Sequence, residues 1–228
     1  MRLILVRHGQ TTANVDELLD TGAPGALLTA LGHTQAAALP AALAAERIDV
    51  LYVSTLLRTH QTAAPLAAAR GLEPQVRAGL REVRAGSLEL RGDEPAIHRY
   101  LSTTLAWSRG EVDLRMPGAE TGAEVYARYD AVVAEIEGTG AATAVVVSHG
   151  AVIRSWSAAR AGNVSPELAA RSRLSNTGAI VLEGGTATGW HAVTWEGRAL
   201  GGPAVEDPPG TEGPAGEPVG DRAGNLPR

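Results

Sequence analysis

Short apolar runs alternate with longer segments of helical character over the first 200 residues of this chain. Residues 3–6, 49–53 and 144–147 form largely apolar runs with the length and composition of buried strands. Two later runs, at residues 180–182 and 191–194, are separated by glycine-rich turn signals. The hydrophobic pattern therefore predicts five strands.

Helical segments lie between these strands. Residues 30–46, 57–70 and 151–161 have helical character, and Gly71 suits the C-terminal stop of the second segment. Strands that alternate with helices form a mostly parallel sheet that is covered on both faces. The sequence thus predicts an α/β fold, a three-layer αβα sandwich, in which the last two strands can add an antiparallel edge.

Residues 85–140 interrupt this alternation. Two helices are expected there, at residues 93–107 and 120–137, and Thr121 with Glu124 forms a capping box at the start of the second one. We interpret this stretch as a helical cap insertion that covers a site at the edge of the sheet.

A change in composition near residue 201 marks the end of the predicted domain. Of residues 201–228, 13 are Gly or Pro, and apolar residues are sparse. Such a segment buries too little apolar surface to offset the entropy lost on ordering. We therefore predict one domain over residues 1–200 and a disordered tail over residues 201–228.

Charge and composition exclude several classes of protein. The net charge of −5 disfavours nucleic-acid binding, and no apolar run approaches the ~20 residues of a membrane span. The chain has no cysteine, and its histidines and carboxylates lack metal-ligand spacing. The N-terminus has no leader pattern. We expect a cytoplasmic protein that uses neither a metal nor a cofactor and does not bind membranes.

Two histidines follow predicted strands directly. Arg7-His8-Gly9 comes after the first buried strand, and Ser148-His149-Gly150 comes after the third. Ligands bind beyond the carboxyl ends of parallel strands, and a helix N-terminus there favours an anion. One such histidine is more often an ordinary loop residue, but two strand–His–Gly endings favour a shared site. The helix after His149 is expected to offer free N–H groups to that anion.

A cation is expected near the same edge. Arg58 falls just inside the helix that follows the second strand. A guanidinium in a first helical turn is usually solvated, but here it would lie where positive helix ends converge. That position is unfavourable unless an anion is bound. An arginine fork also matches phosphate geometry.

Together these motifs resemble the histidine phosphatase superfamily, which is also called phosphoglycerate-mutase-like, and within it the phosphatase branch. The resemblance extends from residue 1 to about residue 195, with the motifs in the expected order. The segments that carry it are residues 7–11, 32–36, 54–63, 80–82, 117–121 and 148–150.

The resemblance implies a role for each matching residue. His8 is expected to be the nucleophile that takes up the phosphoryl group as a phosphohistidine, and Glu82 the proton donor to the leaving oxygen. His149 is expected to act with them, most effectively when protonated. The implied substrate-binding residues, which hold the phosphoryl oxygens or add polar contacts, are Arg7, Asn14, Arg58 and Gly150.

Three functions remain compatible with the sequence. The first is a phosphomonoester hydrolase that acts on small phosphorylated metabolites, the second a cofactor-dependent phosphoglycerate mutase, and the third a catalytically silent module that binds phosphorylated ligands. Mutases of the family carry Glu-Arg-His-Tyr-Gly around the acid, whereas this chain has Glu-Val-Arg-Ala-Gly from Glu82 onward. We therefore favour hydrolysis. The substrate and the oligomeric state, a homodimer included, stay open.

Overall fold

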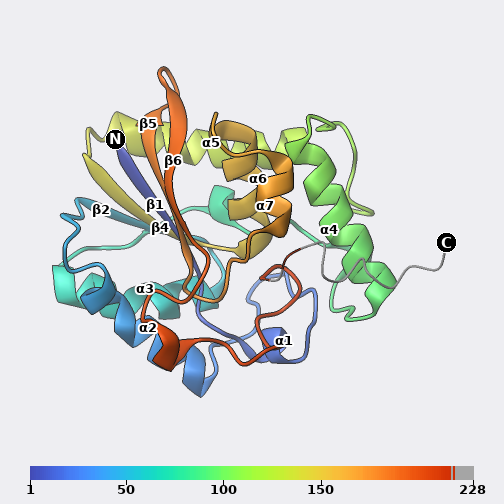
Figure 1. Cartoon of the computed structure of the whole chain (residues 1–228), viewed down its shortest axis with the longest axis horizontal. Coiled ribbons are helices and arrows are strands. Elements are labelled where there is room, and N and C mark those ends of the chain that lie inside the picture. Colours follow the sequence, from blue (N-terminus) through green and yellow to red (C-terminus); the bar gives the residue numbers. More distant parts are fainter. Residues whose placement is uncertain (217, 219–228) are drawn as a thin grey trace.

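A six-stranded sheet runs through the middle of the computed structural model, which describes residues 1–216 and 218 (Figure 1). Its strands are β1 (Arg2–Arg7), β2 (Val50–Val53), β3 (Gln75–Val76), β4 (Thr143–Ser148), β5 (Ala179–Gly185) and β6 (Gly189–Glu196). In the order β3-β2-β4-β1-β5-β6, the first four strands are parallel, and β5 and β6 pair antiparallel. The predicted α/β fold with an antiparallel edge is thereby confirmed.

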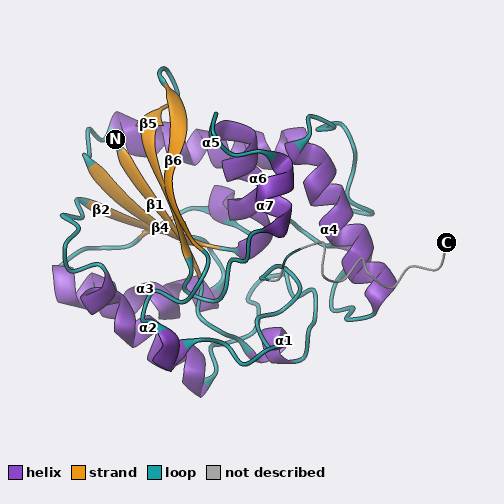
Figure 2. Ribbon diagram, viewed as in Figure 1, coloured by secondary structure: helices purple, strands orange, loops and turns teal. Residues whose placement is uncertain are grey.

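Helices cover both faces of this sheet (Figure 2). The α-helices of the described residues are α1 (Thr12–Val15), α2 (Ala30–Ala42), α3 (Leu57–Arg70), α4 (Glu94–Ser108), α5 (Gly122–Gly138), α6 (Gly150–Arg160) and α7 (Pro166–Arg171). Short 3₁₀ helices are η1 (Ala78–Leu80), η2 (Gly86–Leu88) and η3 (Pro203–Val205). None of the helices in this part of the chain is long and apolar enough to cross a membrane.

Alternating side chains of each strand divide the core into two layers. Leu3 and Leu5 of β1 belong to the cluster that includes the apolar faces of α4, α5 and α6. Ile4 and Val6 point to the other face, where they join the apolar residues of α2 and α3. Because both faces are covered, the strand is apolar at every position between its two arginines.

The pairing of three neighbouring strands sets the position of the site. In β1 and β4, Arg7 lies beside Ser148, and in β2 and β4, Val53 lies beside Val147. The chain therefore leaves all three strands at one edge of the sheet. The residues that come next, side by side at that edge, are His8, Ser54 and His149.

Local end signals in the sequence act as predicted. The helix α3 ends at Arg70, and Gly71 takes the left-handed conformation with φ of 63°. At the start of α5, Thr121 and Glu124 make both hydrogen bonds of the capping box. The bounds of the predicted strands and helices lie within four residues of the observed ones, whereas the two-residue strand β3 and the short helix α1 were not predicted.

The predicted cap insertion is divided between two layers of the structure. Val125, Tyr129 and Val132 of α5 are buried in the same cluster as the sheet residues, so α5 is a layer helix. In Figure 1 the helix α4 lies on the far side of α6 from the sheet. Of the two expected helices, only α4 therefore extends the molecule beyond the αβα layers.

The prediction of a disordered tail is wrong for its first part. Residues 201–216 are ordered on the body of the protein and include η3 and two buried acidic residues, Asp207 and Glu212. Apolar burial is indeed sparse there, but polar contacts with the body replace it. Residues 217 and 219–228 lie outside the described part of the chain.

Two glycines allow the loop after β1 to lie against α2. A Cβ atom at Gly9 would lie 2.7 Å from the carbonyl oxygen of Gly32, and one at Gly32 would overlap the carbonyl oxygen of Gln10. Next to this contact, the amide N–H of Gln10 donates to Oε1 of Gln35 at 2.8 Å. The segment 32–36 of α2 thus packs against the loop that follows His8 and stabilises it.

We predict that Gly32→Ala lowers the free energy of unfolding by about 1–3 kcal/mol, because the added methyl group forces the His8 loop away from α2. Gly138→Ala is the matched control, since a Cβ atom there meets nothing within 4 Å. Urea unfolding of both variants measures the effect. Equal stability of Gly32→Ala and the unaltered protein would refute the packing argument.

Candidate active site

Polar side chains from three strand ends converge at the carboxyl edge of the sheet. The rings of His8 and His149 lie edge to face with centroids 5.2 Å apart, and Nε of Arg58 lies 3.3 Å from Nδ1 of His149. A cleft opens beside them. Five of the residues predicted from the sequence line it: Arg7, His8, Asn14, Arg58 and Glu82.

The ring of His8 presents an unprotonated Nε2. Its Nδ1 lies 2.8 Å from the carbonyl oxygen of Gly9, and because a carbonyl only accepts, the ring proton sits on Nδ1. Burial lowers the pKa of His8 well below its ordinary value of 6.5, and the positive charges of Arg58 and Arg7 act in the same direction. The ring is therefore neutral at physiological pH, as a nucleophile must be.

His149 is also neutral, with the opposite tautomer. Its Nδ1 accepts from Nε of Arg58, so the proton sits on Nε2, which lies 2.7 Å from Oγ of Ser54. Burial and then the charge of Arg58 lower the pKa of His149 well below 6.5. The ring is fully buried behind Arg58 and does not line the cleft. The expected protonated His149 is thus not the form that this substrate-free structure favours.

Arg58 is held in place by a residue that the sequence analysis missed. Asp20 accepts from Nη1 through Oδ2 at 3.3 Å and from Nη2 through its backbone carbonyl at 2.9 Å. The Asp20 carboxylate also accepts from the amide N–H of Ala26. Asp20 lines the cleft, so a carboxylate faces any ligand that binds beside Arg58. No local pattern in the sequence distinguishes Asp20 from a solvated loop residue.

Arg7 lies buried on the other side of His8. Its Nη1 donates to the carbonyl of Leu174 at 2.8 Å, and its Nη2 donates to the carbonyl of Glu212. Burial lowers the pKa of Arg7, while the nearby carboxylates of Asp207 and Glu82 oppose that shift. The guanidinium keeps its charge, because the pKa of an arginine side chain starts far above neutral pH.

The carboxylate of Glu82 caps the helix that follows His149. It accepts from the backbone N–H groups of Ala151 at 3.0 Å and Val152 at 2.8 Å, and from its neighbour Val83 at 2.9 Å. The sequence analysis expected these N–H groups to be free for an anionic ligand. In the structure the anion at this helix N-terminus is Glu82 itself, which is thereby fixed at the wall of the cleft.

Asn14 and Gly150 complete the set of predicted residues. Oδ1 of Asn14 accepts from the Thr11 backbone and from Nδ2 of Asn176, which also donates to the His8 carbonyl. Gly150 begins α6, and a Cβ atom there would lie 3.1 Å from Nε of Arg7. Both residues therefore lie next to the cluster, and Gly150 allows Arg7 to pack against α6.

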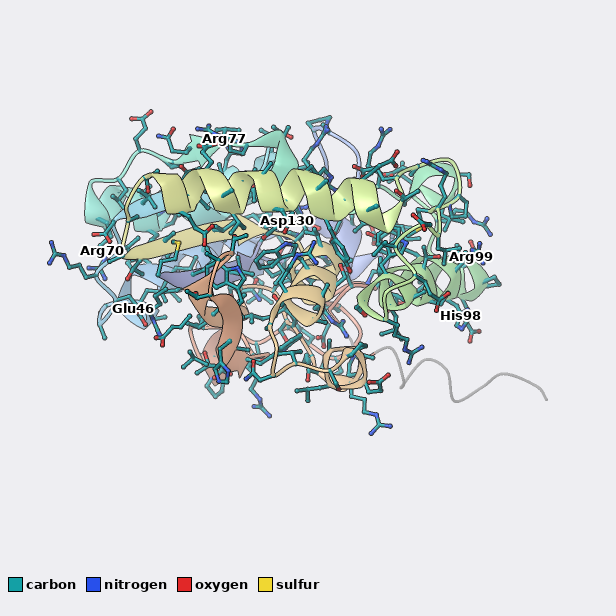
Figure 3. The ribbon with its side chains drawn as sticks, turned by 90° about the horizontal axis from the view of Figure 1, so that it is seen from above. Glu46, Arg70, Arg77, His98, Arg99 and Asp130 are labelled. Atoms are coloured by element: carbon teal, nitrogen blue, oxygen red, sulfur yellow. The ribbon has the colours of Figure 1, made fainter. Side chains whose placement is uncertain are left out.

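The helix α4 contributes one residue to the cleft, and it is not one that the sequence singled out. Tyr100 lines the cleft, and its hydroxyl donates to the carbonyl of Val83 at 2.7 Å. Figure 3 shows His98 and Arg99 at the outer end of the molecule, and both are exposed. Trp107 is a buried core residue. Only the inner face of α4 thus reaches the site.

The described residues offer no second centre with comparable chemistry. Among residues 1–216 and 218, no group of three or more His, Asp or Glu side chains could hold a metal ion. Another pocket lies between α4, α6 and α7, but none of the predicted site residues lines it. The cleft beside His8 is therefore the candidate active site.

Comparison with known proteins identifies relatives with the same arrangement of elements. A family model described as the histidine phosphatase superfamily (branch 1) matches residues 3–197. A mycobacterial glucosyl-3-phosphoglycerate phosphatase, solved as a complex with VO3, superposes with a TM-score of 0.72 and 28% sequence identity. That superposition covers 86% of this chain and 98% of the solved chain.

Two of the curated relatives come from Mycobacterium tuberculosis. A glucosyl-3-phosphoglycerate phosphatase is 32% identical over 173 residues, which cover 69% of this chain and 74% of the relative. A PE-PGRS family protein is 40% identical over 213 residues, which cover 86% of this chain but 36% of that protein. The chain thus spans about a third of the length of the PE-PGRS relative.

We predict that the free energy of unfolding falls as the pH drops below 6.5. The unfolded chain binds a proton at His8 and at His149 there, whereas the folded protein, with both pKa values lowered, does not. Each histidine then lowers the free energy of unfolding by about 1 kcal/mol for every pH unit below 6.5. Stability conferred by the neutral rings is complete above pH 6.5 and is lost progressively toward pH 5.

Urea unfolding at pH 7, 6 and 5 tests this dependence. His149→Gln should have a shallower slope between pH 6.5 and 5 than the unaltered protein, by about 1 kcal/mol per pH unit, because one of the two proton-binding groups is gone. His33→Gln, a change on the exposed face of α2, is the control. Identical slopes for all three proteins would show that His149 titrates normally.

Proposed function

The chain belongs to the histidine phosphatase superfamily, and from that membership we propose that it is a metal-independent phosphomonoester hydrolase that acts through a phosphohistidine at His8. The observation that carries the proposal is the unprotonated Nε2 of His8 in a cleft that two guanidinium groups flank. A neutral nitrogen nucleophile and fixed positive charge are what phosphoryl transfer requires of a protein that uses no metal.

In the first step, the lone pair of His8 Nε2 forms a bond to phosphorus while the bond from phosphorus to the ester oxygen breaks. The ring proton stays on Nδ1, which donates a hydrogen bond to the carbonyl oxygen of Gly9. This hydrogen bond stabilises the positive charge of the phosphorylated ring. Glu82 gives its proton to the leaving oxygen. A general acid at this position stabilises the leaving oxygen as it departs.

Arg7 and Arg58 are proposed to hold the phosphoryl oxygens. Their charges are fixed before the substrate arrives, so no reorganisation is needed when negative charge spreads over the equatorial oxygens. His149 does not line the cleft, so it contacts a phosphoryl oxygen only when that oxygen displaces the hydrogen bond from Nε of Arg58 to Nδ1 of His149. A dianion there favours protonation of His149, which turns its Nδ1 into a donor.

In the second step, water attacks the phosphohistidine. Glu82, now ionised, takes the proton of the attacking water, and the electron pair of the breaking nitrogen–phosphorus bond returns to Nε2 of His8. Inorganic phosphate leaves, and both residues regain their starting state. The reaction as proposed thus needs no oxidant, no metal and no co-substrate other than water.

The cleft supports a small substrate. It must hold the phosphoryl group and at least part of the leaving group between the residues that line it. Leu18, Leu19 and Tyr100 add apolar surface to the lining of the cleft, which also includes Asp20. We propose small phosphorylated metabolites as substrates, in line with the phosphatase name of the relatives, and hydrolysis rather than transfer because the mutase signature around Glu82 is missing.

We predict that His8→Ala lowers the turnover of p-nitrophenyl phosphate at least about a thousandfold, because the covalent route is lost. The unaltered protein, quenched during turnover at alkaline pH, should carry one phosphoryl group on His8 in intact-mass spectra. His33→Ala serves as the control. Turnover is measured with and without EDTA. Loss of activity on addition of the chelator, or normal turnover in His8→Ala, would contradict the mechanism.

The same preparation separates hydrolase from mutase. With 3-phosphoglycerate and a bisphosphoglycerate primer, a hydrolase releases inorganic phosphate, whereas a mutase forms 2-phosphoglycerate without net release. A silent binding module does neither and never acquires the phosphoryl group. We expect phosphate release alone.

Glu82→Gln is predicted to slow the release of poor leaving groups most. An alkyl phosphate needs a proton on its leaving oxygen, and its rate should fall by about 10² to 10⁴. p-Nitrophenolate leaves without a proton, so the rate of phosphoenzyme formation from p-nitrophenyl phosphate should fall much less. The exposed Glu94→Gln in α4 is the control. Equal losses for both substrates would show that Glu82 does not donate the proton.

A further inference from the structure

The segment from Asp207 to Gly216, here the C-terminal segment, lies against the candidate active site. In Figure 1 it is the red chain that runs beside α1 toward the middle of the molecule. The family match ends at residue 197, so this segment lies beyond it. Its two acidic side chains are almost fully buried, with Asp207 6% and Glu212 0% exposed. Burial of two carboxylates is costly unless each has partners.

Asp207 fastens the start of the segment to the His8 loop. Its Oδ1 accepts from Nε2 of Gln35 at 3.0 Å and from Nε2 of Gln10 at 3.3 Å, and its Oδ2 accepts from the amide N–H of Asn176 at 3.0 Å. Asn176 in turn donates to the carbonyl of His8. The segment is therefore bonded to the elements that hold the nucleophile.

Glu212 reaches the other side of the site. Its carboxylate forms an ion pair with Nη1 of Arg173 at 2.8 Å, and its backbone carbonyl accepts from Nη2 of Arg7. The carbonyl of Leu174 accepts from Nη1 of the same guanidinium. Both terminal nitrogens of Arg7 are thus engaged by backbone carbonyls, which fix the plane of the group.

The remaining nitrogen of Arg7 has no partner. Nε is buried and makes no hydrogen bond among the described residues, although Arg7 itself is 1% exposed and lines the cleft. An unpaired buried donor on a charged group is costly, and such groups are rare in folded proteins. A phosphoryl oxygen bound in the cleft would supply the missing acceptor.

Glycines let the segment approach the site with backbone alone. A Cβ atom at Gly216 would overlap Nη1 of Arg7, and one at Gly213 would overlap Nδ2 of Asn14. Between them, Pro214 and Ala215 line the cleft together with His8. The glycines of this segment thus serve close contact with two predicted phosphate-binding side chains.

We propose that the C-terminal segment completes the phosphate pocket, and that the carbonyl of Glu212 positions Arg7 so that its Nε faces a phosphoryl oxygen of the substrate. The inference rests on the proposed function, since it assigns the segment to the same site. It makes residues 207–216 part of the binding site for a phosphate monoester and for inorganic phosphate as its product.

Gly216→Ala in the full-length chain tests the proposal. The added methyl group displaces Arg7, and we expect the inhibition constant of inorganic phosphate and the KM for p-nitrophenyl phosphate to rise about 10- to 100-fold, the effect of losing one charge-assisted hydrogen bond. Gly162→Ala is the matched control, because a Cβ atom there meets nothing within 4 Å. Its inhibition constant should equal that of the unaltered protein.

The inhibition constant separates positioning from a merely structural role. A partly unfolded variant loses active enzyme and hence apparent kcat, but the molecules that remain folded bind phosphate as before. An unchanged inhibition constant in Gly216→Ala would overturn the proposal. So would tighter phosphate binding with faster turnover, since the segment would then obstruct the site and not build it.

A second variant covers the case in which Gly216→Ala does not fold. Asp207→Asn keeps the size of the side chain but weakens its bonds to Gln10 and Gln35, and should raise the inhibition constant in the same direction, by about threefold. No change in this variant would count against the proposal. If the unaltered protein neither hydrolyses p-nitrophenyl phosphate nor binds inorganic phosphate by calorimetry, the proposed function fails first and the inference with it.

Discussion

Two buried guanidinium groups, those of Arg7 and Arg58, flank two imidazoles that burial and this positive charge keep neutral. Because the guanidinium groups are charged and the rings beside them are neutral, the centre of the site has a net positive charge. The carboxylates around it, of Asp20 and Glu82, are tied to Arg58 and to the start of α6. In the mechanism that we propose, a phosphate dianion enters a pocket whose positive groups are already in position and whose nucleophile is already unprotonated.

The topology of the sheet makes this arrangement possible. Because β2, β4 and β1 are parallel neighbours, the residues after them emerge together at one edge, although they are far apart in the sequence. Supports from outside the sheet then fix each group: Gly32 lies under the His8 loop, Asp20 holds Arg58, and the carbonyl of Glu212 holds Arg7. The strands thus set the positions of the site residues, and contacts from the loops and helices fix the orientations of their side chains.

Local sequence signals were sufficient to predict the fold and the convergence of His8 and His149, because apolar runs determine where strands end and parallel pairing brings those ends together. Asp20 and Tyr100 could not be predicted from local sequence. Asp20 reaches the cleft because of the path of a loop, and Tyr100 because it lies on the face of α4 that packs toward the site. Composition misled at residues 201–216. Glycines there indicate close approach to Arg7 and Asn14, and buried hydrogen bonds of Asp207 replace the apolar contacts that the sequence lacks.

The protonation of the two imidazoles tests the central claim most directly. Long-range proton–nitrogen NMR spectra of the substrate-free protein, recorded from pH 8 to pH 5, report the state of each ring nitrogen. We predict a protonated Nδ1 with a free Nε2 at His8 and the reverse at His149, with both rings still neutral at pH ~6.5, where an ordinary imidazole is half protonated, because burial lowers both pKa values. A ring of His8 that titrates near 6.5, or that carries its proton on Nε2, would contradict this prediction.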